Sequence, residues 1–388
     1  TRMDYTNKAL KEEFKIKPVA AYKCDKFDNM IKKEKPDVVV VCSIDRTHHK
    51  YIIRAMELGC DVITEKPMTV DASKCRQILD AVKRTKRKLR VTFNYRYTPH
   101  STKVRELIMD KVIGKVNSVH FEWLLDTSHG ADYFRRWHRD KRNSGGLMVH
   151  KSTHHFDLVN FWLGTQPETV FSMGDLMFYG RENAENRGIT KFYSRCRGAK
   201  NAKGDPFAID LNSSKNLKGL YLNAEHEDGY YRDQSVFGDN ISIEDTMGVM
   251  VRYKNKAIMT YSLNAYMPWE GFNVNLNGDK GRIEVFVGEN TYINAGGDIS
   301  AEGTLARKRI MVFPQFDKPY EVKTEEGKGG HGGGDPVMLN DIFGTPKKDK
   351  FKRAASHVDG AMSILTGIAA NQSMKTGLPV NIDTLVKF

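Results

Sequence analysis

Two histidines and an aspartate recur at helical spacing in one ionisable stretch of the chain. His150 and His154 are four residues apart and Asp157 follows three later, so a helix would place all three on one face. Histidine titrates near neutral pH, which suits a general base that takes a proton from a hydroxyl. The pair could also bind zinc, but the H-E-x-x-H form needs a glutamate where Lys151 stands, and no further ligands are identified. We predict no metal and keep one structural alternative, core histidines hydrogen-bonded to Asp157.

A second candidate for chemistry is the tripeptide Glu65-Lys66-Pro67. It follows the apolar run Asp61–Thr64, which predicts a short buried strand, so we expect it at the sheet edge where open α/β sheets bind ligands. A lysine there can hydrogen-bond a substrate hydroxyl, and the proline can fix a tight turn, for instance through a cis bond. The alternative is an ordinary exposed Glu-Lys pair before a turn proline.

A glycine-rich stretch runs from Gly330 to Asp335 and contains His-Gly-Gly-Gly. Some esterases use this motif in the oxyanion hole, but the chain has no G-x-S-x-G nucleophile elbow, which excludes an esterase. Gly327–Gly332 also matches G-x-G-x-x-G, and we reject it as a dinucleotide fingerprint because no parallel strand with an acidic end follows. Two interpretations stay open, a flexible loop and a loop whose backbone approaches a ligand while His331 hydrogen-bonds it.

Residues 1–97 alternate helical and strand patterns, as parallel α/β units do. Helices are predicted over Lys8–Phe14, Phe27–Lys33, His49–Leu58 and Ala72–Arg84, and strands over Pro18–Tyr22, Asp37–Cys42, Asp61–Thr64 and Leu89–Phe93. The unbroken valine run in the second strand predicts a strand covered on both faces. No strand, glycine-rich turn and helix precede Lys8, so we expect the pyrophosphate-binding half of a dinucleotide fold upstream of Thr1.

Residues 98–388 have a different texture and predict an α+β domain with one large, mostly antiparallel sheet. Strands are expected over Lys115–Leu125, Thr246–Tyr253, Ala257–Leu263, Phe272–Leu276, Arg282–Val287 and Arg309–Phe313, and around Val170-Phe171. Helices are expected over Thr102–Met109, from Gly145-Gly146 to about Leu163, over Pro336–Phe343 and over Ala354–Ser373, the last packing near the first domain. Residues 179–245 are polar and irregular, which predicts a folded insertion or an active-site flap.

Composition narrows the class of protein. A chain of 388 residues with 40% hydrophobic and 28% charged residues fits two globular domains, with no stretch long enough to span a membrane. The net charge of +13 suggests nucleic acid as a partner. Clusters such as Lys83–Lys88, however, fall where a predicted helix ends, and a favourable interaction with the helix dipole explains them better than a nucleic-acid-binding groove. A cytoplasmic location is favoured. A periplasmic location stays open because the sequence begins at Thr1 without a methionine.

Five short blocks occur in an order and spacing that resemble one enzyme family. They are Cys42–His48, Ala55–Gly59, Glu65-Lys66-Pro67, Asn94–Pro99, and the Gly-Gly helix with His154-x-x-Asp157 and Trp162-Leu163-Gly164. Together they are similar to the glucose–fructose oxidoreductase and inositol dehydrogenase family, Gfo/Idh/MocA. The blocks cover roughly the first 165 residues, and Ser373 with Gly377–Val380 fits the family as well.

This resemblance implies a Rossmann domain, a second domain on a large open sheet that forms homodimers or homotetramers, and bound NAD or NADP, with NAD favoured. By position, Lys66 would touch the nicotinamide ribose and the reacting hydroxyl, and His154 would be the general base. The nicotinamide side of the cofactor would be lined by Ser43, His48, Glu65, Lys66, Asn94 and Arg96.

One departure from the family pattern affects the substrate. Family members usually carry an aspartate one turn before the catalytic histidine, and here that position is His150. An imidazole can donate or accept where a carboxylate only accepts, so His150 is a second candidate for the base. We expect Trp137, His150 and His331 to shape the substrate site.

Three functions follow as hypotheses. The first is an NAD(P)-dependent oxidoreductase that removes a hydride from the carbon of a sugar or glycoside ring hydroxyl. The second is an NAD-dependent glycoside hydrolase, in which transient oxidation leaves no net redox change. The third is a non-catalytic sugar or cofactor sensor on the same fold, against which the presence of both Lys66 and His154 argues.

Overall fold

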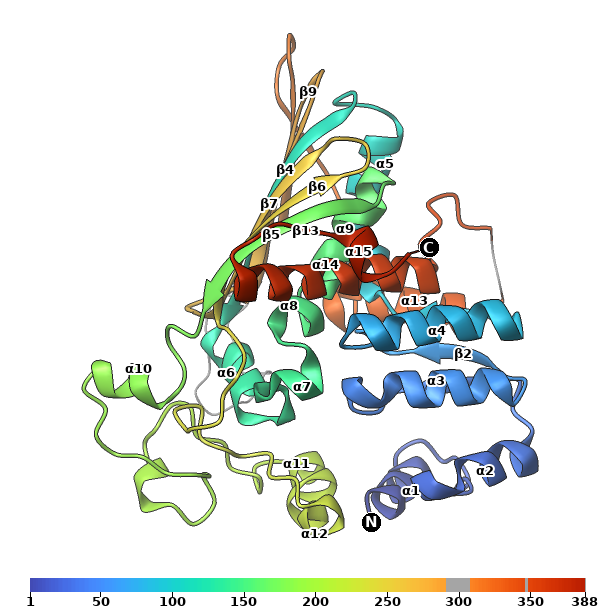
Figure 1. The fold of residues 1–388 in the computed structure, drawn as a ribbon, viewed down its shortest axis with the longest axis vertical. Helices are drawn as coiled ribbons and strands as arrows, with labels where there is room; N and C mark the ends of the chain where they lie inside the picture. The colour runs from blue at the N-terminus through green and yellow to red at the C-terminus, as the bar shows by residue number, and fades with distance from the viewer. Residues whose placement is uncertain (291–307, 346–347, 388) are drawn as a thin grey trace.

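The computed structural model describes residues 1–290, 308–345 and 348–387 (Figure 1). Within these residues the strands form a four-stranded sheet, in the order β1-β2-β3-β12, and a nine-stranded sheet, in the order β11-β10-β9-β8-β4-β7-β6-β5-β13. The fold class is the predicted one, a Rossmann-type sheet followed by a large, mostly antiparallel open sheet.

The smaller sheet brings the ends of three predicted strands together. Strands β1 (Val38–Val41), β2 (Asp61–Thr64) and β3 (Leu89–Val91) pair in parallel, with Val41 opposite Thr64 and Thr64 opposite Val91. Helices α3 (His48–Glu57) and α4 (Ala72–Thr85) connect them, and the Asp71 side chain caps α4 by accepting from the Lys74 N–H. Because the strands are parallel, the residues after Val41, Thr64 and Val91 share one edge.

Two predictions for this region are wrong. Pro18–Tyr22 forms no strand, and the segment between α1 (Arg2–Glu12) and α2 (Phe27–Glu34) has no regular structure before a short 3₁₀ turn. Strand β1 is not covered on both faces, since Val39 and Val41 are buried while Val38 and Val40 are 43% and 49% exposed. The reason is position, because β1 lies at the edge of this sheet and the helices pack against the face of Val39 and Val41.

The larger sheet contains every strand predicted after residue 98. Its strands are β4 (Val116–Asp126), β5 (Pro167–Asp175), β6 (Thr246–Tyr253), β7 (Ile258–Met267), β8 (Glu270–Gly278), β9 (Gly281–Asn290), β10 (Lys308–Pro314), β11 (Tyr320–Val322) and β13 (Val380–Asn381). Neighbours pair antiparallel except β4 and β7, which are parallel. Side chains alternate along β6, where Met247, Val249 and Val251 are buried, so one face packs on the core.

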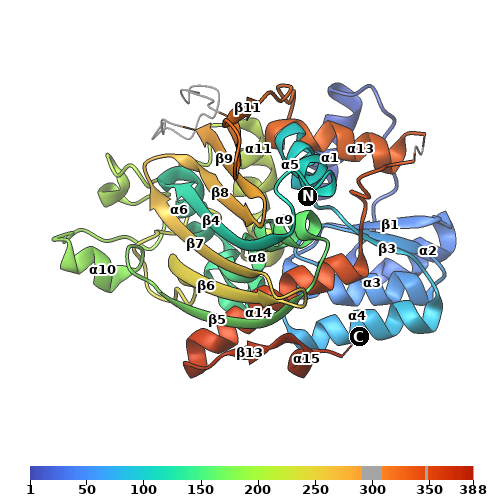
Figure 2. The same cartoon turned by 90° about the horizontal axis from the view of Figure 1, so that it is seen from above.

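Helices lie on the side of this sheet that faces the smaller one (Figure 2). They include α5 (Pro99–Met109), α9 (Thr153–Leu163) and α14 (His357–Thr376). Helix α14 was predicted to begin at Ala354. Instead, Ala355-Ser356 form strand β12, which pairs antiparallel with β3, and Ser356 caps the helix through a reciprocal hydrogen bond with Asp359.

The predicted helix from Gly146 to Leu163 is interrupted in the structure. Helix α8 (Leu147–His150) and α9 are separated at Lys151-Ser152, where the Ser152 N–H donates to the Leu147 carbonyl and the His154 N–H donates to the Lys151 carbonyl. Neither bond has the regular four-residue spacing of an α-helix, so the face carrying the two histidines is bent between them.

The remaining helices are short, at four to ten residues each. They are α6 (Thr127–Arg135), α7 (Lys141–Ser144), α10 (Arg181–Asn186), α11 (Lys215–Leu220), α12 (Glu225–Asp228), α13 (Gly334–Phe343) and α15 (Ile382–Leu385). Residues 179–245 are folded, since Tyr179, Leu211 and Phe237 are buried. In the described residues, no helix has both the length and the apolar character needed to cross a membrane.

Candidate active site

A cavity of about 210 Å³ lies beside the carboxyl ends of the parallel strands. The side chains that line it are of ionisable types, and they come from segments next to the smaller sheet and next to the larger one. The lining residues are Lys66, Tyr95, His129, Asp132, Tyr133, Arg136, His150, Lys151, His154 and His331. Four residues singled out from the sequence, Lys66, His150, His154 and His331, therefore meet at one site.

Lys66 reaches this cavity from the turn after β2. The Lys66–Pro67 peptide is cis, and a ring nitrogen of the buried His48 lies 2.9 Å from the Pro67 carbonyl oxygen. The Lys66 Nζ lies 3.4 Å from His150 Nε2 and 3.3 Å from the His150 carbonyl oxygen. Burial lowers the pKa of Lys66 to about 8, while Asp45 and Glu65 act in the opposite direction. Lys66 is thus not the exposed surface lysine of the alternative interpretation.

His150 is paired with an aspartate that sequence reasoning did not select. Its Nδ1 lies 2.5 Å from Asp45 Oδ2, and with the proton on Nδ1 the ring donates to Asp45 and leaves Nε2 free to accept from Lys66. Burial raises the pKa of Asp45 well above its ordinary value, while the charge of Lys66 acts in the opposite direction. Burial, and then the charge of Lys66, holds the pKa of His150 well below its ordinary value. Asp45 follows β1 within the block Cys42–His48. Its position at the sheet edge is the signal by which the sequence could have identified it.

His154 is buried, and it lacks the partner expected for a structural histidine. Its Nδ1 has no hydrogen-bond partner in the described residues, and its ring packs edge-on against Tyr95 at 4.8 Å between centroids. Burial, and then the charges of Lys66 and Lys151, holds the pKa of His154 well below its ordinary value. A neutral imidazole at neutral pH is the form that can accept a proton.

Asp157 does not bind the histidines, which contradicts the structural alternative for this face. Its two oxygens accept from Arg96 Nε and Nη2, each at 2.6 Å, and Arg96 Nη2 also donates to Asp359 at 2.9 Å. Arg96 is 2% exposed and does not line the cavity. These contacts give Arg96 a structural role between η3 (Asn94–Tyr97), α9 and α14, and none of them supports its predicted role in cofactor binding.

The other residues predicted for the cofactor lie along the strand edge next to Lys66. Glu65 accepts from the Thr92 hydroxyl at 2.8 Å, and the Ser43 carbonyl lies 2.8 Å from His48 Nε2. Asn94 donates to Asp335 at 2.7 Å, while its own side-chain oxygen is buried without a partner in the described residues. This unused acceptor, three residues after β3, fits a group that brings N–H or O–H donors, as a nicotinamide riboside does.

The glycine-rich loop approaches protein backbone, which neither interpretation anticipated. A Cβ on Gly334 would lie 2.4 Å from the Asn94 carbonyl oxygen, so glycine lets the loop pack against η3. His331 lines the cavity and donates from Nδ1 to Asp335 Oδ2 at 2.7 Å. Trp137, the other predicted substrate residue, does not line the cavity, and it stacks on His138 with ring centroids 3.6 Å apart.

A further wall of the cavity comes from residues that the sequence analysis missed. His129 lies 2.9 Å from both Glu270 oxygens and 3.0 Å from the Tyr133 hydroxyl. Lys151 lies 3.7 Å from Glu270, over the Trp123 ring. These residues come from α6, β8 and the turn after α8, and no short motif connects them. Among the described residues, no group of three or more His, Cys, Asp or Glu side chains could hold a metal ion.

Two family models match the chain. The model described as "Oxidoreductase family, NAD-binding Rossmann fold" matches residues 3–93, and "Oxidoreductase family, C-terminal alpha/beta domain" matches residues 105–382. Together they span both sheets and the cavity between them.

Individual proteins are similar over much or part of the chain. YteT of Bacillus subtilis (strain 168), named as an oxidoreductase, is 37% identical over 369 residues, which is 93% of this chain and 85% of YteT. Inositol 2-dehydrogenase of Rhizobium meliloti (strain 1021) is 37% identical over 134 residues, 34% of this chain and 38% of that protein. The structure of levoglucosan dehydrogenase in complex with NADH superposes with a TM-score of 0.64 at 16% identity, covering 97% of this chain and 87% of that one.

Proposed function

Since the chain belongs to the Gfo/Idh/MocA family of NAD(P)-dependent oxidoreductases, we propose that it oxidises or reduces a ring carbon of a sugar or glycoside. The observation that carries this proposal is the meeting of Lys66 and His154 in one cavity, with His150 between Lys66 and Asp45. A ring hydroxyl placed there has a proton acceptor and a positive hydrogen-bond donor within reach.

The roles of these side chains follow from their protonation states. His154 is neutral at neutral pH and takes the hydroxyl proton at its imidazole. Lys66, with a pKa of about 8, donates a hydrogen bond from its ammonium to the hydroxyl oxygen and favours the negative charge that develops there. Asp45 holds the His150 ring with Nε2 toward Lys66, so it positions that lysine indirectly.

The cofactor would be held at the strand edge, where Glu65, Lys66 and Asn94 follow β2 and β3. When bound, its nicotinamide ring supplies the hydride acceptor for the carbon that carries the hydroxyl. We propose NAD rather than NADP, in keeping with the NADH bound in the levoglucosan dehydrogenase complex.

The substrate class rests on the character of the cavity and on the names of relatives. Inositol and levoglucosan, which name two of the similar dehydrogenases, are cyclic polyhydroxy compounds. The cavity offers histidine, tyrosine and lysine side chains, which hydrogen-bond hydroxyl groups, and its volume of about 210 Å³ suits a single ring.

The test is to incubate the protein with NAD⁺ and a panel of sugars and glycosides, following nicotinamide absorbance and product mass. We expect the loss of two hydrogens from the substrate, matched by cofactor reduction. Release of an aglycone without net reduction would instead indicate a hydrolase that oxidises transiently. Binding of sugar and cofactor with no product from any panel member would overturn the proposal in favour of a sensor.

We further propose a homodimer or homotetramer that uses the open face of the nine-stranded sheet. Met173, Met250 and Ile258 on that sheet are 68%, 51% and 42% exposed, and exposed apolar side chains on a large sheet favour association. Light scattering should give a mass of at least twice 44.2 kDa, and a monomer at micromolar concentration would contradict this.

A further inference from the structure

Three arginines converge on one aspartate that lines the cavity. Asp132 Oδ1 accepts from Arg135 Nη1 at 2.9 Å, and Asp132 Oδ2 accepts from Arg232 Nη2 at 2.6 Å and lies 3.8 Å from Arg136 Nη1. Burial alone would raise the pKa of Asp132, but Arg232, Arg135 and Arg136 outweigh it and hold the pKa below its ordinary value. The corner therefore has three positive charges and one negative charge.

Several donors in this corner have no acceptor. Arg136 Nε, Arg232 Nε and Arg232 Nη1 are buried without a hydrogen-bond partner in the described residues, and Arg232 is only 7% exposed. The Tyr230 hydroxyl interacts with Arg136, but as a neutral group it adds no negative charge. A buried guanidinium with free N–H groups is costly, so such a corner is expected to serve a negatively charged group.

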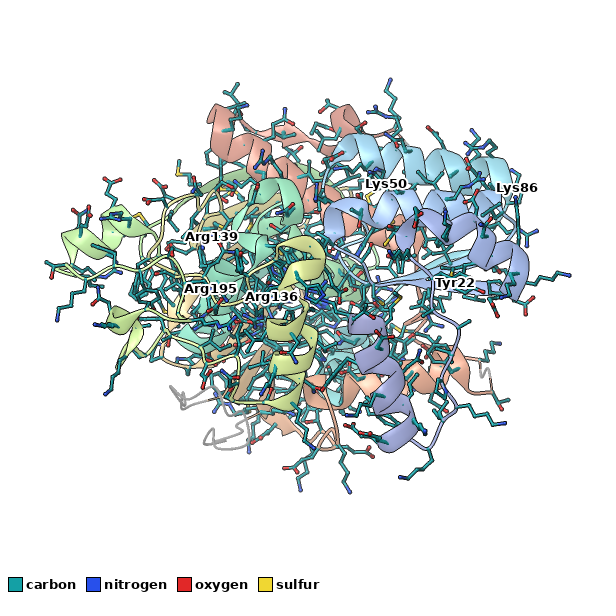
Figure 3. All side chains as sticks on the ribbon, turned by 90° about the horizontal axis from the view of Figure 1, so that it is seen from below. Tyr22, Lys50, Lys86, Arg136, Arg139 and Arg195 are labelled. Carbon is teal, nitrogen blue, oxygen red and sulfur yellow. The ribbon has the colours of Figure 1, made fainter. Side chains whose placement is uncertain are left out.

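In the part of the chain that the structure describes, these three arginines pair with no carboxylate other than Asp132, and Glu289 near the cavity accepts from the Tyr95 hydroxyl at 3.3 Å. Glu270 is engaged by His129 and Lys151, and Asp45 is engaged by His150. Another cluster has the opposite ratio of charges, because the single Arg195 binds two carboxylates, Glu225 at 2.5 Å and Asp233 at 2.8 Å. Figure 3 labels Arg136 near the middle of the molecule, away from the surface cations Lys50 and Lys86.

Arg136 faces the same cavity as the proposed catalytic residues. It lines the cavity with Asp132, and its charge also lowers the pKa of His150 and of Lys66, which places it within electrostatic range of both. Arg232 does not line the cavity and stands behind Asp132, so it contributes charge while Arg136 offers the contact. Arg232 belongs to residues 179–245, which links that insertion to the site.

We propose that the substrate is an acidic sugar, and that Arg136 binds a carboxylate on its ring while Lys66 and His154 act on a ring hydroxyl. This inference rests on the proposed function for its second half only. A carboxylate offers about four lone-pair sites in one plane and matches the fork of a guanidinium, so it can accept from two N–H groups of Arg136 at once. It also supplies the negative charge that the three arginines lack.

The test compares ligands that differ in charge and little else. Binding of D-glucuronate and D-galacturonate to the protein is measured by calorimetry against the corresponding uronamides and neutral hexoses, with and without NAD⁺. We expect at least one uronate to bind about 10- to 100-fold more tightly than its uronamide, and the difference to shrink at high salt. Equal affinity for uronate and uronamide in both pairs would overturn the inference, as would tighter binding of hexose 6-phosphates than of uronates.

Variants locate the binding group. Arg136→Gln should remove most of the preference for the uronate while changing uronamide affinity less than about threefold. Arg142→Gln is the matched control, because Arg142 is 89% exposed and pairs with Asp140 at the surface. An unchanged preference in R136Q would overturn the assignment of Arg136.

Binding and turnover report on separate claims. If uronates bind selectively but no panel compound is oxidised, the proposed function fails while the carboxylate site stands. If neutral glycosides are oxidised with kcat/KM equal to that of their uronides, the proposed function stands and this inference fails.

Discussion

The two ends of the cavity differ in how their charges are balanced. At the Lys66 end, Lys66 contacts His150, and His150 donates to the buried Asp45. At the other end, three guanidinium groups surround Asp132 alone. Both ends are built from groups largely removed from water, so the difference lies in the kind of group that each end uses.

The difference implies two tasks: the Lys66 end can exchange protons, and the arginine end can bind a negative charge. Burial brings the pKa of Lys66 to about 8 and keeps His154 neutral, so protons can be exchanged there near neutral pH. Arginine stays protonated at any working pH, so the other end cannot respond to a proton and can only attract an anion. Substitutions at the two ends should therefore change different measured quantities.

The largest effect is expected from Lys66→Met. It removes the ammonium that contacts His150, and kcat/KM for cofactor reduction should fall about 10²- to 10⁴-fold, the range typical for a positioned catalytic group. Cofactor affinity, measured by quenching of protein fluorescence, should stay within about threefold. Lys50→Met, on the exposed surface of α3, is the control. A near-normal rate in K66M would contradict the catalytic role proposed for Lys66.

A contrast in stability should distinguish balanced from unbalanced charge. Arg96→Met leaves Asp157 and Asp359 without their shared cation and should lower the free energy of unfolding by about 3–5 kcal/mol. Arg136→Gln removes one charge from an excess of positive charge and should change it by about 1 kcal/mol or less. Urea unfolding measures both, and equal losses would contradict the proposed imbalance at Asp132.

A smaller effect on rate is expected from Asp45→Asn. An amide oxygen is a weaker acceptor for His150 Nδ1–H than Asp45, so kcat should fall about 10- to 100-fold, with KM for the cofactor nearly unchanged. A merely structural role would instead lower stability without moving the pH dependence of kcat/KM, so both are measured. Asp28→Asn, whose side chain is 40% exposed, serves as the control.

The pH dependence of the wild-type protein should show the lysine directly. The pKa of Lys66 is lowered from 10.5 to about 8, so its ammonium form is lost as pH rises through 8. If the ammonium is the working form, kcat/KM should be level near pH 7 and fall toward tenfold per unit above pH 8. Initial rates between pH 6 and pH 10 test this, and a level profile up to pH 10 would contradict it.

Much of this site could be predicted from the chain because parallel strands impose a shared edge. Lys66, Glu65 and Asn94 each follow a strand with a clear apolar pattern, so the sequence could place them together. His154 and His150 were predicted from helical spacing, and both line the cavity even though the helix is interrupted between them.

The pairings between distant segments could not be predicted. Asp45 and His150 are 105 residues apart, and Arg96 and Asp157 are 61 apart, so neither pair follows from a local repeat. Helical spacing alone predicts a local hydrogen bond between His154 and Asp157, and that prediction is wrong because Asp157 accepts from Arg96. Arg232 reaches Asp132 from an irregular segment whose pattern predicts neither strand nor helix.

The most direct test of the account is a comparison of His154→Asn with His150→Asn in single-turnover cofactor reduction, using a substrate identified from the panel and saturating NAD⁺. If His154 is the general base, H154N should reduce the cofactor about 10²- to 10⁴-fold more slowly than wild type, and H150N, which disturbs only the positioning of Lys66, should be affected less. A near-normal rate in H154N, or a greater loss in H150N, would contradict the assignment.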